Sequence, residues 1–303
     1  MKPSSVSKAI LTGVFIATAS LLLFNFNDSS EVTSYISKQF ADTYKLQRNT
    51  SMVATVNQLS GNSANSNSSG GITHMTEEDK KLMQMGNTEM WNLLTSNRYS
   101  SRPTASYAAE KSKISAIHNE KSVTIDVQVW DWKDRNDDTN MEKVTGTWTL
   151  NVNKELQDLI THVFQDIYDD PSKPVIDLSD NGRGCYVTRG VNNKDSNKPS
   201  IHAFGTAIDI NPNTTVVYNG LKYTNMQVSD AHVATEDEWK KLPESHKKYQ
   251  LIYKDCPIVK IFKAYSFAWG GDFTTSRKDA MHFSFIGEQT REESQKMAAQ
   301  YNK

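Results

Sequence analysis

Two short segments of the chain carry residues whose types and spacing could bind a metal ion. Residues 200–209 read SIHAFGTAID and hold His202 and Asp209, and residues 279–285 read DAMHFSF and hold His282. Zinc prefers imidazole and carboxylate ligands at about 2.0–2.2 Å, and a catalytic site keeps three protein ligands and one open position. Two imidazoles and one carboxylate fit that rule, so the sequence predicts a catalytic zinc site.

A loop and two strands are the elements that must bring these ligands together. Seven positions separate His202 from Asp209, which is a poor fit to one helix face. Gly205 allows a turn between them, and the apolar residues at 207–210 suit a buried strand. Around His282 apolar residues alternate along the chain, so the pattern predicts a second strand on which His282 faces away from the core side, toward a possible cleft.

A further acid stands three residues before His282. Asp279 would lie near the metal ion without binding it. Such a carboxylate can take a proton from an attacking water and later deliver it to a leaving amine. The spacing therefore predicts that Asp279 is the general base and general acid of a hydrolase.

The pattern S-x-H-x-x-G-x-A-x-D, followed downstream by an acid, two other residues and His, resembles the VanY-type D-alanyl-D-alanine carboxypeptidases. These group with L-alanyl-D-glutamate endopeptidases and D,D-dipeptidases that share a hedgehog-like zinc fold. The resemblance covers roughly residues 125–285. Three further segments carry it, namely 184–189 (GCYVTR), 262–265 (FKAY) and 269–273 (WGGDF).

The resemblance also implies roles for individual residues. His202, Asp209 and His282 would bind zinc, Asp279 would be the base and acid, and Arg189 would steady the substrate or the oxyanion. The chain departs from the family where Ser266-Phe267 replaces Gly-Trp and where Phe273 replaces Trp. These changes keep bulk and leave the ligands in place, but fine specificity does not transfer.

Composition is that of a chain that buries a core and does not bind nucleic acid. The 303 residues are 37% hydrophobic and carry a net charge of −1, so no global basic field is present. Only two cysteines occur, Cys185 and Cys256, which excludes a disulfide scaffold. Two buried thiols or one disulfide both remain open.

The N-terminus carries a targeting pattern. Two lysines precede an uncharged apolar run over 9–24. No small-x-small cleavage pattern follows directly, which favours an uncleaved membrane anchor over a cleaved signal, and both place the rest of the chain outside the cytoplasm. Residues 60–71 are rich in Ser, Asn and Gly. We expect a signal-anchor or signal peptide at 1–27 and a flexible linker at 28–72.

The remainder predicts an α+β fold with an antiparallel sheet flanked by helices. Thr76 and Asp79 resemble a capping box that opens a helical lead-in at 73–120. Period-two alternation at 123–129 and 144–152 predicts a strand hairpin. Amphipathic or charged helices are expected after Asn153, at about 257–265 and at 292–301. Hairpins mixed with helices predict a hedgehog/DD-peptidase-like zinc peptidase domain at 121–303.

The expected function is zinc-dependent hydrolysis of peptidoglycan stem peptides, with D-alanyl-D-alanine carboxypeptidase favoured over L-alanyl-D-glutamate endopeptidase. A non-catalytic zinc-containing wall-binding module is a second alternative, although a purely structural site needs no spare acid such as Asp279. A serine D,D-peptidase is disfavoured because S-D-N at 179–181 and S-x-x-K at 245–248 occur in the wrong order and K-T-G is absent. We expect an extracytoplasmic monomer whose partners are the stem peptide and the membrane.

Overall fold

The computed structural model describes residues 71–302 apart from 138, 180–184, 230–231, 249 and 275–276. These residues belong to one compact unit, Ser68–Lys303. The predicted anchor at 1–27 and nearly all of the predicted linker lie outside the described residues. Within the described part of the chain, no helix is both long and apolar enough to cross a membrane.

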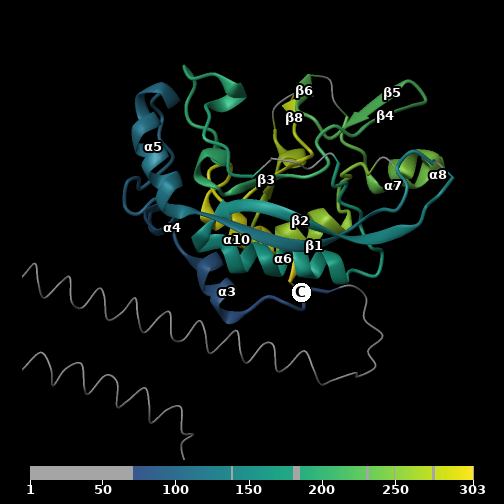
Figure 1. The fold of residues 1–303 in the computed structure, drawn as a ribbon, viewed down its shortest axis with the longest axis horizontal. Helices are drawn as coiled ribbons and strands as arrows, with labels where there is room; N and C mark the ends of the chain where they lie inside the picture. Colours follow the sequence, from purple (N-terminus) through teal and green to yellow (C-terminus); the bar gives the residue numbers. More distant parts are fainter. Residues whose placement is uncertain are drawn as a thin grey trace, which may run out of the picture. The chain divides into compact units, whose positions relative to one another are not determined.

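A long hairpin and one amphipathic helix form the first two layers. β1 (Ser122–Trp132) pairs antiparallel with β2 (Lys143–Asn153), and alternate side chains are buried as the period-two pattern predicts. α6 (Gln157–Asp169) runs along this hairpin (Figure 1) and buries its apolar stripe. The rings of Trp148 and Phe164 meet edge to face with centroids 5.6 Å apart, so the hairpin and the helix share one core.

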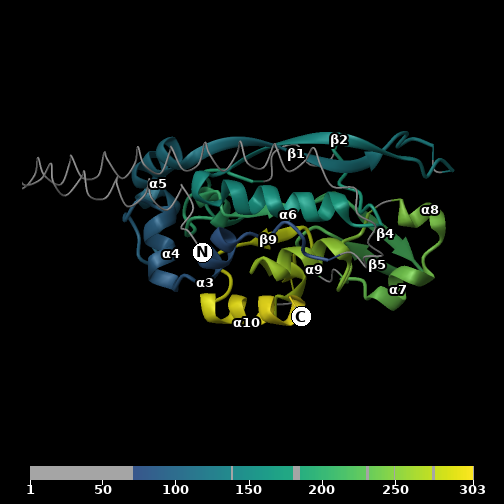
Figure 2. The same ribbon diagram turned by 90° about the horizontal axis from the view of Figure 1, so that it is seen from below.

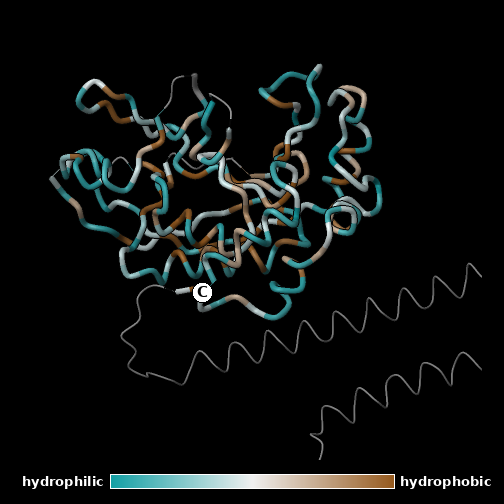
Figure 3. The backbone as a smooth tube through the Cα atoms, turned by 180° about the vertical axis from the view of Figure 1, so that it is seen from behind, coloured by the Kyte–Doolittle hydropathy of each residue, from teal (hydrophilic) through white to brown (hydrophobic). Residues whose placement is uncertain are grey.

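Two further helices continue this layering on the other side of α6. Figure 2 shows the hairpin, α6, α9 (Pro257–Ala264) and α10 (Arg291–Tyr301) one beyond another. Pro257 occupies the first turn of α9, where its missing N–H costs nothing. Phe262 of α9 meets Phe164 at 5.9 Å and stacks on Phe283 at 4.3 Å. The hydrophobic stretches in Figure 3 gather in these inner layers.

The antiparallel strands are divided among several small sheets. A central sheet has the order β3 (Ala207–Asp209), β9 (His282–Ser284), β7 (Ala268–Trp269). Two-stranded sheets pair β4 (Thr215–Tyr218) with β5 (Leu221–Thr224), and β6 (Val228–Ser229) with β8 (Arg277–Lys278). The α+β class is confirmed, but the expectation of one antiparallel sheet was too simple, because alternation along a strand does not specify which strands will pair.

The lead-in before the hairpin consists of three helices, α3 (Glu77–Gln84), α4 (Asn87–Leu94) and α5 (Tyr107–Lys121). The capping box at Thr76 and Asp79 is confirmed by reciprocal hydrogen bonds. The chain leaves the helical conformation at Met85, the C-cap of α3, and Gly86 is the N-cap of α4, so this stretch forms two helices and not one. Trp91 and Ile114 are buried in the same core as α6, so the lead-in is part of the packed unit.

Short helical turns and two small helices complete the described part. They are η1 (Lys154–Leu156), η2 (Val191–Asn193), η3 (Ile201–Phe204), α7 (Glu236–Lys241), α8 (Glu244–Lys247) and η4 (Gly270–Asp272). Asn153 caps η1 with its side chain, and α6 follows directly. Cys185 and Cys256 are both buried and free. Of the two alternatives left open by the sequence, the structure therefore contains two buried thiols and not a disulfide.

Candidate metal centre

His202 lies in the short turn η3, which ends at Gly205. Gly205 adopts the left-handed conformation with φ of 66°, and a Cβ there would lie 2.4 Å from the Tyr186 ring. Both the dihedral angle and the close approach require glycine. The predicted turn between His202 and the following strand is therefore present, and it returns the chain directly into β3.

The central sheet places the other two predicted ligands side by side. Asp209 on β3 is the register partner of His282 on β9, and cross-strand partners project on the same face of a sheet. His282 is only 7% exposed, and the following residue, Phe283, is fully buried. Phe283 packs in the core, so His282 lies on the opposite face of β9, as the alternation predicts, although its ring is itself buried.

Three ligand atoms converge in this layer. Nε2 of His202 lies 3.2 Å from Nδ1 of His282 and 3.3 Å from Oδ1 of Asp209, and Nδ1 of His282 lies 3.0 Å from the same oxygen. A tetrahedral ion with bonds of about 2.0–2.1 Å keeps its ligand atoms about 3.3 Å apart. The donor set and its spacing therefore fit a zinc-sized ion.

A backbone carbonyl orients the His202 ring. Nδ1 of His202 lies 2.9 Å from the carbonyl oxygen of Cys185. A carbonyl only accepts hydrogen bonds, so Nδ1 carries the proton and Nε2 presents its lone pair to the other two ligand atoms. This is how metal-binding histidines are commonly held, with the second nitrogen tied to a backbone or carboxylate acceptor.

The electrostatics of the trio reflect its burial. Burial alone would raise the pKa of Asp209, but His202 and His282 outweigh it and hold that pKa well below its usual range. Burial alone would lower the pKa of His282, and the adjacent Asp209 carboxylate raises it instead. Asp209 is therefore a carboxylate in the folded chain, as a metal ligand must be.

Asp279 approaches the trio from the loop that precedes β9. Its backbone carbonyl accepts the N–H of His282 at 3.1 Å, and its own N–H donates to the carbonyl of Gly270 at 3.1 Å. The residue is 9% exposed, and Oδ1 has no hydrogen-bond partner among the described residues. Burial raises the pKa of Asp279 to about 6; His282 opposes this shift and Asp209 adds to it. An acid that titrates near neutral pH suits proton transfer in both directions.

Arg189 is tied to the metal-binding turn by its backbone. Its carbonyl accepts the N–H of Ser200 at 3.0 Å, two residues before His202. The side chain makes no ion pair or hydrogen bond with the part of the chain that the structure describes, and it is half-buried. Its predicted contact with substrate or oxyanion stays a prediction.

Two supporting residues were not singled out by their sequence context. Gly270 lets the Asp279 backbone come close, since a Cβ on Gly270 would lie 2.1 Å from the Asp279 carbonyl oxygen. Asn225 is fully buried and donates to the carbonyls of Asn211 at 2.9 Å and Gln250 at 3.1 Å. Its own carbonyl accepts the N–H of Met281 at 3.0 Å. The Gly-Gly pair at 270–271 was a usable signal for the first, whereas Asn225 lies in a stretch without a recognisable pattern.

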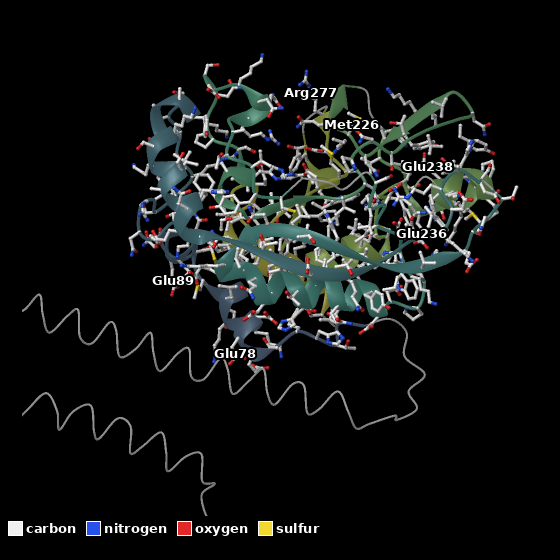
Figure 4. All side chains as sticks on the ribbon, viewed as in Figure 1. Glu78, Glu89, Met226, Glu236, Glu238 and Arg277 are labelled. Atoms are coloured by element: carbon white, nitrogen blue, oxygen red, sulfur yellow. The ribbon has the colours of Figure 1, made fainter. Side chains whose placement is uncertain are left out.

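Two apolar residues lie next to the histidines of the centre. The Phe273 ring lies 6.1 Å from the His282 ring, and Val187, whose N–H donates to the His202 carbonyl at 3.1 Å, is exposed. Figure 4 labels Met226 and Arg277 in the region of β6 and β8, away from Glu78 and Glu89 on α3 and α4.

Comparison with protein families agrees with this geometry. Residues 194–285 match the family model described as D-alanyl-D-alanine carboxypeptidase. This segment belongs to the VanY-like carboxypeptidase family. The match contains His202, Asp209, Asp279 and His282, spans less than a third of the chain, and begins after Arg189. It confirms, for this segment, the resemblance seen in the sequence and supports a peptidase of this kind. No curated protein and no solved structure matches the chain.

Proposed function

We propose that this chain is a zinc peptidase that hydrolyses peptidoglycan stem peptides as a D-alanyl-D-alanine carboxypeptidase. One observation carries the proposal. Ligand atoms of His202, Asp209 and His282 lie 3.0–3.3 Å apart, and the buried carboxylate of Asp279 stands in their field with an unpaired oxygen. The spacing suits an ion, and the spare acid suits hydrolysis.

Each residue has a distinct task in the proposed reaction. A zinc ion held by the three side chains supplies Lewis acidity, which activates water and polarises the scissile carbonyl. Asp279 accepts a proton from the attacking water and donates it to the leaving amine as the C–N bond breaks. Arg189 pairs with the substrate carboxylate or with the developing oxyanion.

The setting of the reaction is part of the proposal. Residues 1–27 have the pattern of a signal-anchor or signal peptide, which supports an enzyme that works outside the cytoplasmic membrane. We propose a monomer that meets the stem peptide from that anchored position, without a nucleic-acid partner. Fractionation of cells that express the full chain, followed by detection in the membrane and in the medium, tests the location.

Digestion of purified muropeptides tests the activity. The full chain, loaded with zinc and assayed with its metal content measured, should remove one terminal alanine from pentapeptide stems, as read by mass spectrometry. Release of whole stems from the sugar-linked alanine would instead identify an L-alanyl-D-glutamate endopeptidase. Tight binding of muropeptides without any cleavage would identify a non-catalytic wall-binding module and overturn the proposal.

A further inference from the structure

Arg102 joins two segments that are far apart in the sequence. It lies between α4 and α5, in the lead-in that the family match does not reach. Nη1 of Arg102 donates to the carbonyl of Gly287 at 3.1 Å and to Oε1 of Glu288 at 3.0 Å. Nη2 donates to the carbonyl of Pro199 at 3.4 Å. One guanidinium thus contacts Pro199 and Gly287, which follow Arg102 by 97 and 185 positions along the chain.

The two joined segments are those that lead into η3 and out of β9. Pro199 stands three residues before His202, and Gly287 stands five residues after His282. They already touch, because a Cβ on Gly287 would lie 2.2 Å from Cδ1 of Ile201. With a φ of 91°, Gly287 turns the chain away from β9 at this contact. The position of His202 relative to His282 therefore depends on what holds these segments together.

The chain that follows Arg102 is held by backbone hydrogen bonds to the segment before η3. The first residue of α5, Tyr107, donates its N–H to the carbonyl of Asn197 at 2.6 Å, and Ala108 donates to Asp195 at 2.9 Å. The Arg102 side chain is 16% exposed, so its ion pair with Glu288 is partly shielded from water. Hydrogen bonds to a charged donor in such a setting are stronger than neutral ones.

We infer that Arg102 is a positioning residue of the metal centre. It holds the His202 turn against the end of the His282 strand, and Glu288 keeps the guanidinium in place. The lead-in then completes the centre from outside the matched family segment. The inference rests on the proposed metal site, but it concerns the separation of the ligands and not the bond that is cut.

Zinc affinity of full-length variants tests the role, by competition with a chromophoric chelator. Arg102→Ala should weaken zinc binding roughly tenfold, as removal of residues that hold ligands in place commonly does. Arg102→Lys should recover part of the loss, because one ammonium can replace only some of the contacts. At saturating zinc, kcat should fall while KM changes little.

Arg98→Ala is the matched control. Arg98 also pairs with a glutamate, Glu120, at 2.8 Å, but it touches neither ligand-bearing segment. Its removal should leave zinc affinity unchanged. Should Arg102→Ala fail to fold, Glu288→Gln and Arg102→Lys provide the measurement. Wild-type zinc affinity in the folded Arg102 and Glu288 variants would overturn the inference. Zinc binding without cleavage in the parent chain would overturn only the proposed activity.

Discussion

Two His–Asp pairs in this molecule, one partly exposed and one buried, use the same side chains in opposite ways. Between α3 and α6, Nδ1 of His162 lies 2.7 Å from Oδ2 of Asp79. The same oxygen also accepts the N–H and the hydroxyl of Thr76, both at 2.8 Å. In the centre, Nδ1 of His282 meets Oδ1 of Asp209 at 3.0 Å, and Nε2 of His202 is the third atom.

The two pairs differ in the hydrogen-bond donors that surround the carboxylate. Oδ2 of Asp79 accepts hydrogen bonds from Thr76 and His162, so this pair joins α3 to α6 without a metal ion. In the centre, by contrast, acceptor atoms face one another. The Nδ1–H of His202 already donates its hydrogen bond to the carbonyl oxygen of Cys185. Buried acceptors that face one another without donors are costly unless a cation or a proton joins them. The metal site thus differs from the structural pair because its polar atoms lack hydrogen-bond donors.

The largest expected effect comes from removing a ligand of the centre. His202→Ala should lose stoichiometric zinc and reduce hydrolysis to background, since two protein ligands do not hold the ion in a catalytic geometry. His162→Ala should retain both, because that histidine belongs to the structural pair. Metal analysis and muropeptide digestion of the two variants test this contrast, and equal zinc content in both would contradict it.

The next effect separates chemistry from metal binding. Asp279→Ala should keep its zinc and lose about 10²–10⁴-fold in hydrolysis, the usual contribution of a positioned acid–base group. Asp237→Ala, on the exposed helix α7, is the control and should keep full rate. Single-turnover assays with zinc content measured in parallel decide the matter. Full activity in Asp279→Ala would remove its assigned role.

The structural pair should show its effect in stability. Asp79→Ala removes the capping box and the bond to His162, and should lower the free energy of unfolding by about 2–3 kcal/mol. Glu78→Ala, one position earlier and exposed, should change it little. Urea unfolding of both variants provides the measurement. Equal midpoints for the two variants would show that the pair is not structural.

The smallest effect is the pH dependence of that pair. Burial would raise the pKa of Asp79, but His162 and Thr76 lower it overall; the hydrogen bond to Asp79 raises the pKa of His162. The acid's contribution is therefore present above about pH 4 and lost as pH falls, and the histidine's is present below about pH 6.5 and lost as pH rises through its folded pKa. The stability difference between the parent chain and His162→Ala should peak between these values. A flat difference from pH 3 to 9 would contradict the assignment.

The sequence predicted the candidate site better than the sheet around it. His202, Asp209 and His282 stand in two short motifs, and the geometry brings their ligand atoms together. The hairpin, α6 and the capping box were also predicted, because periodicity and capping act over a few residues. The division into small sheets and the buried setting of His282 were not, since both depend on which distant segments pack together.

The amino-acid sequence by itself determined which side chains could bind a metal ion, which stretches form the main helices and strands, and which family the matched segment joins. These features arise from local dihedral preferences and short spacings, which act within a few residues. Tertiary structure alone decided that Asn225 ties the chain after Asp209 to that before His282, and that Arg102 bridges Pro199 and Gly287. Such contacts join residues far apart along the chain, where no local pattern records the partner.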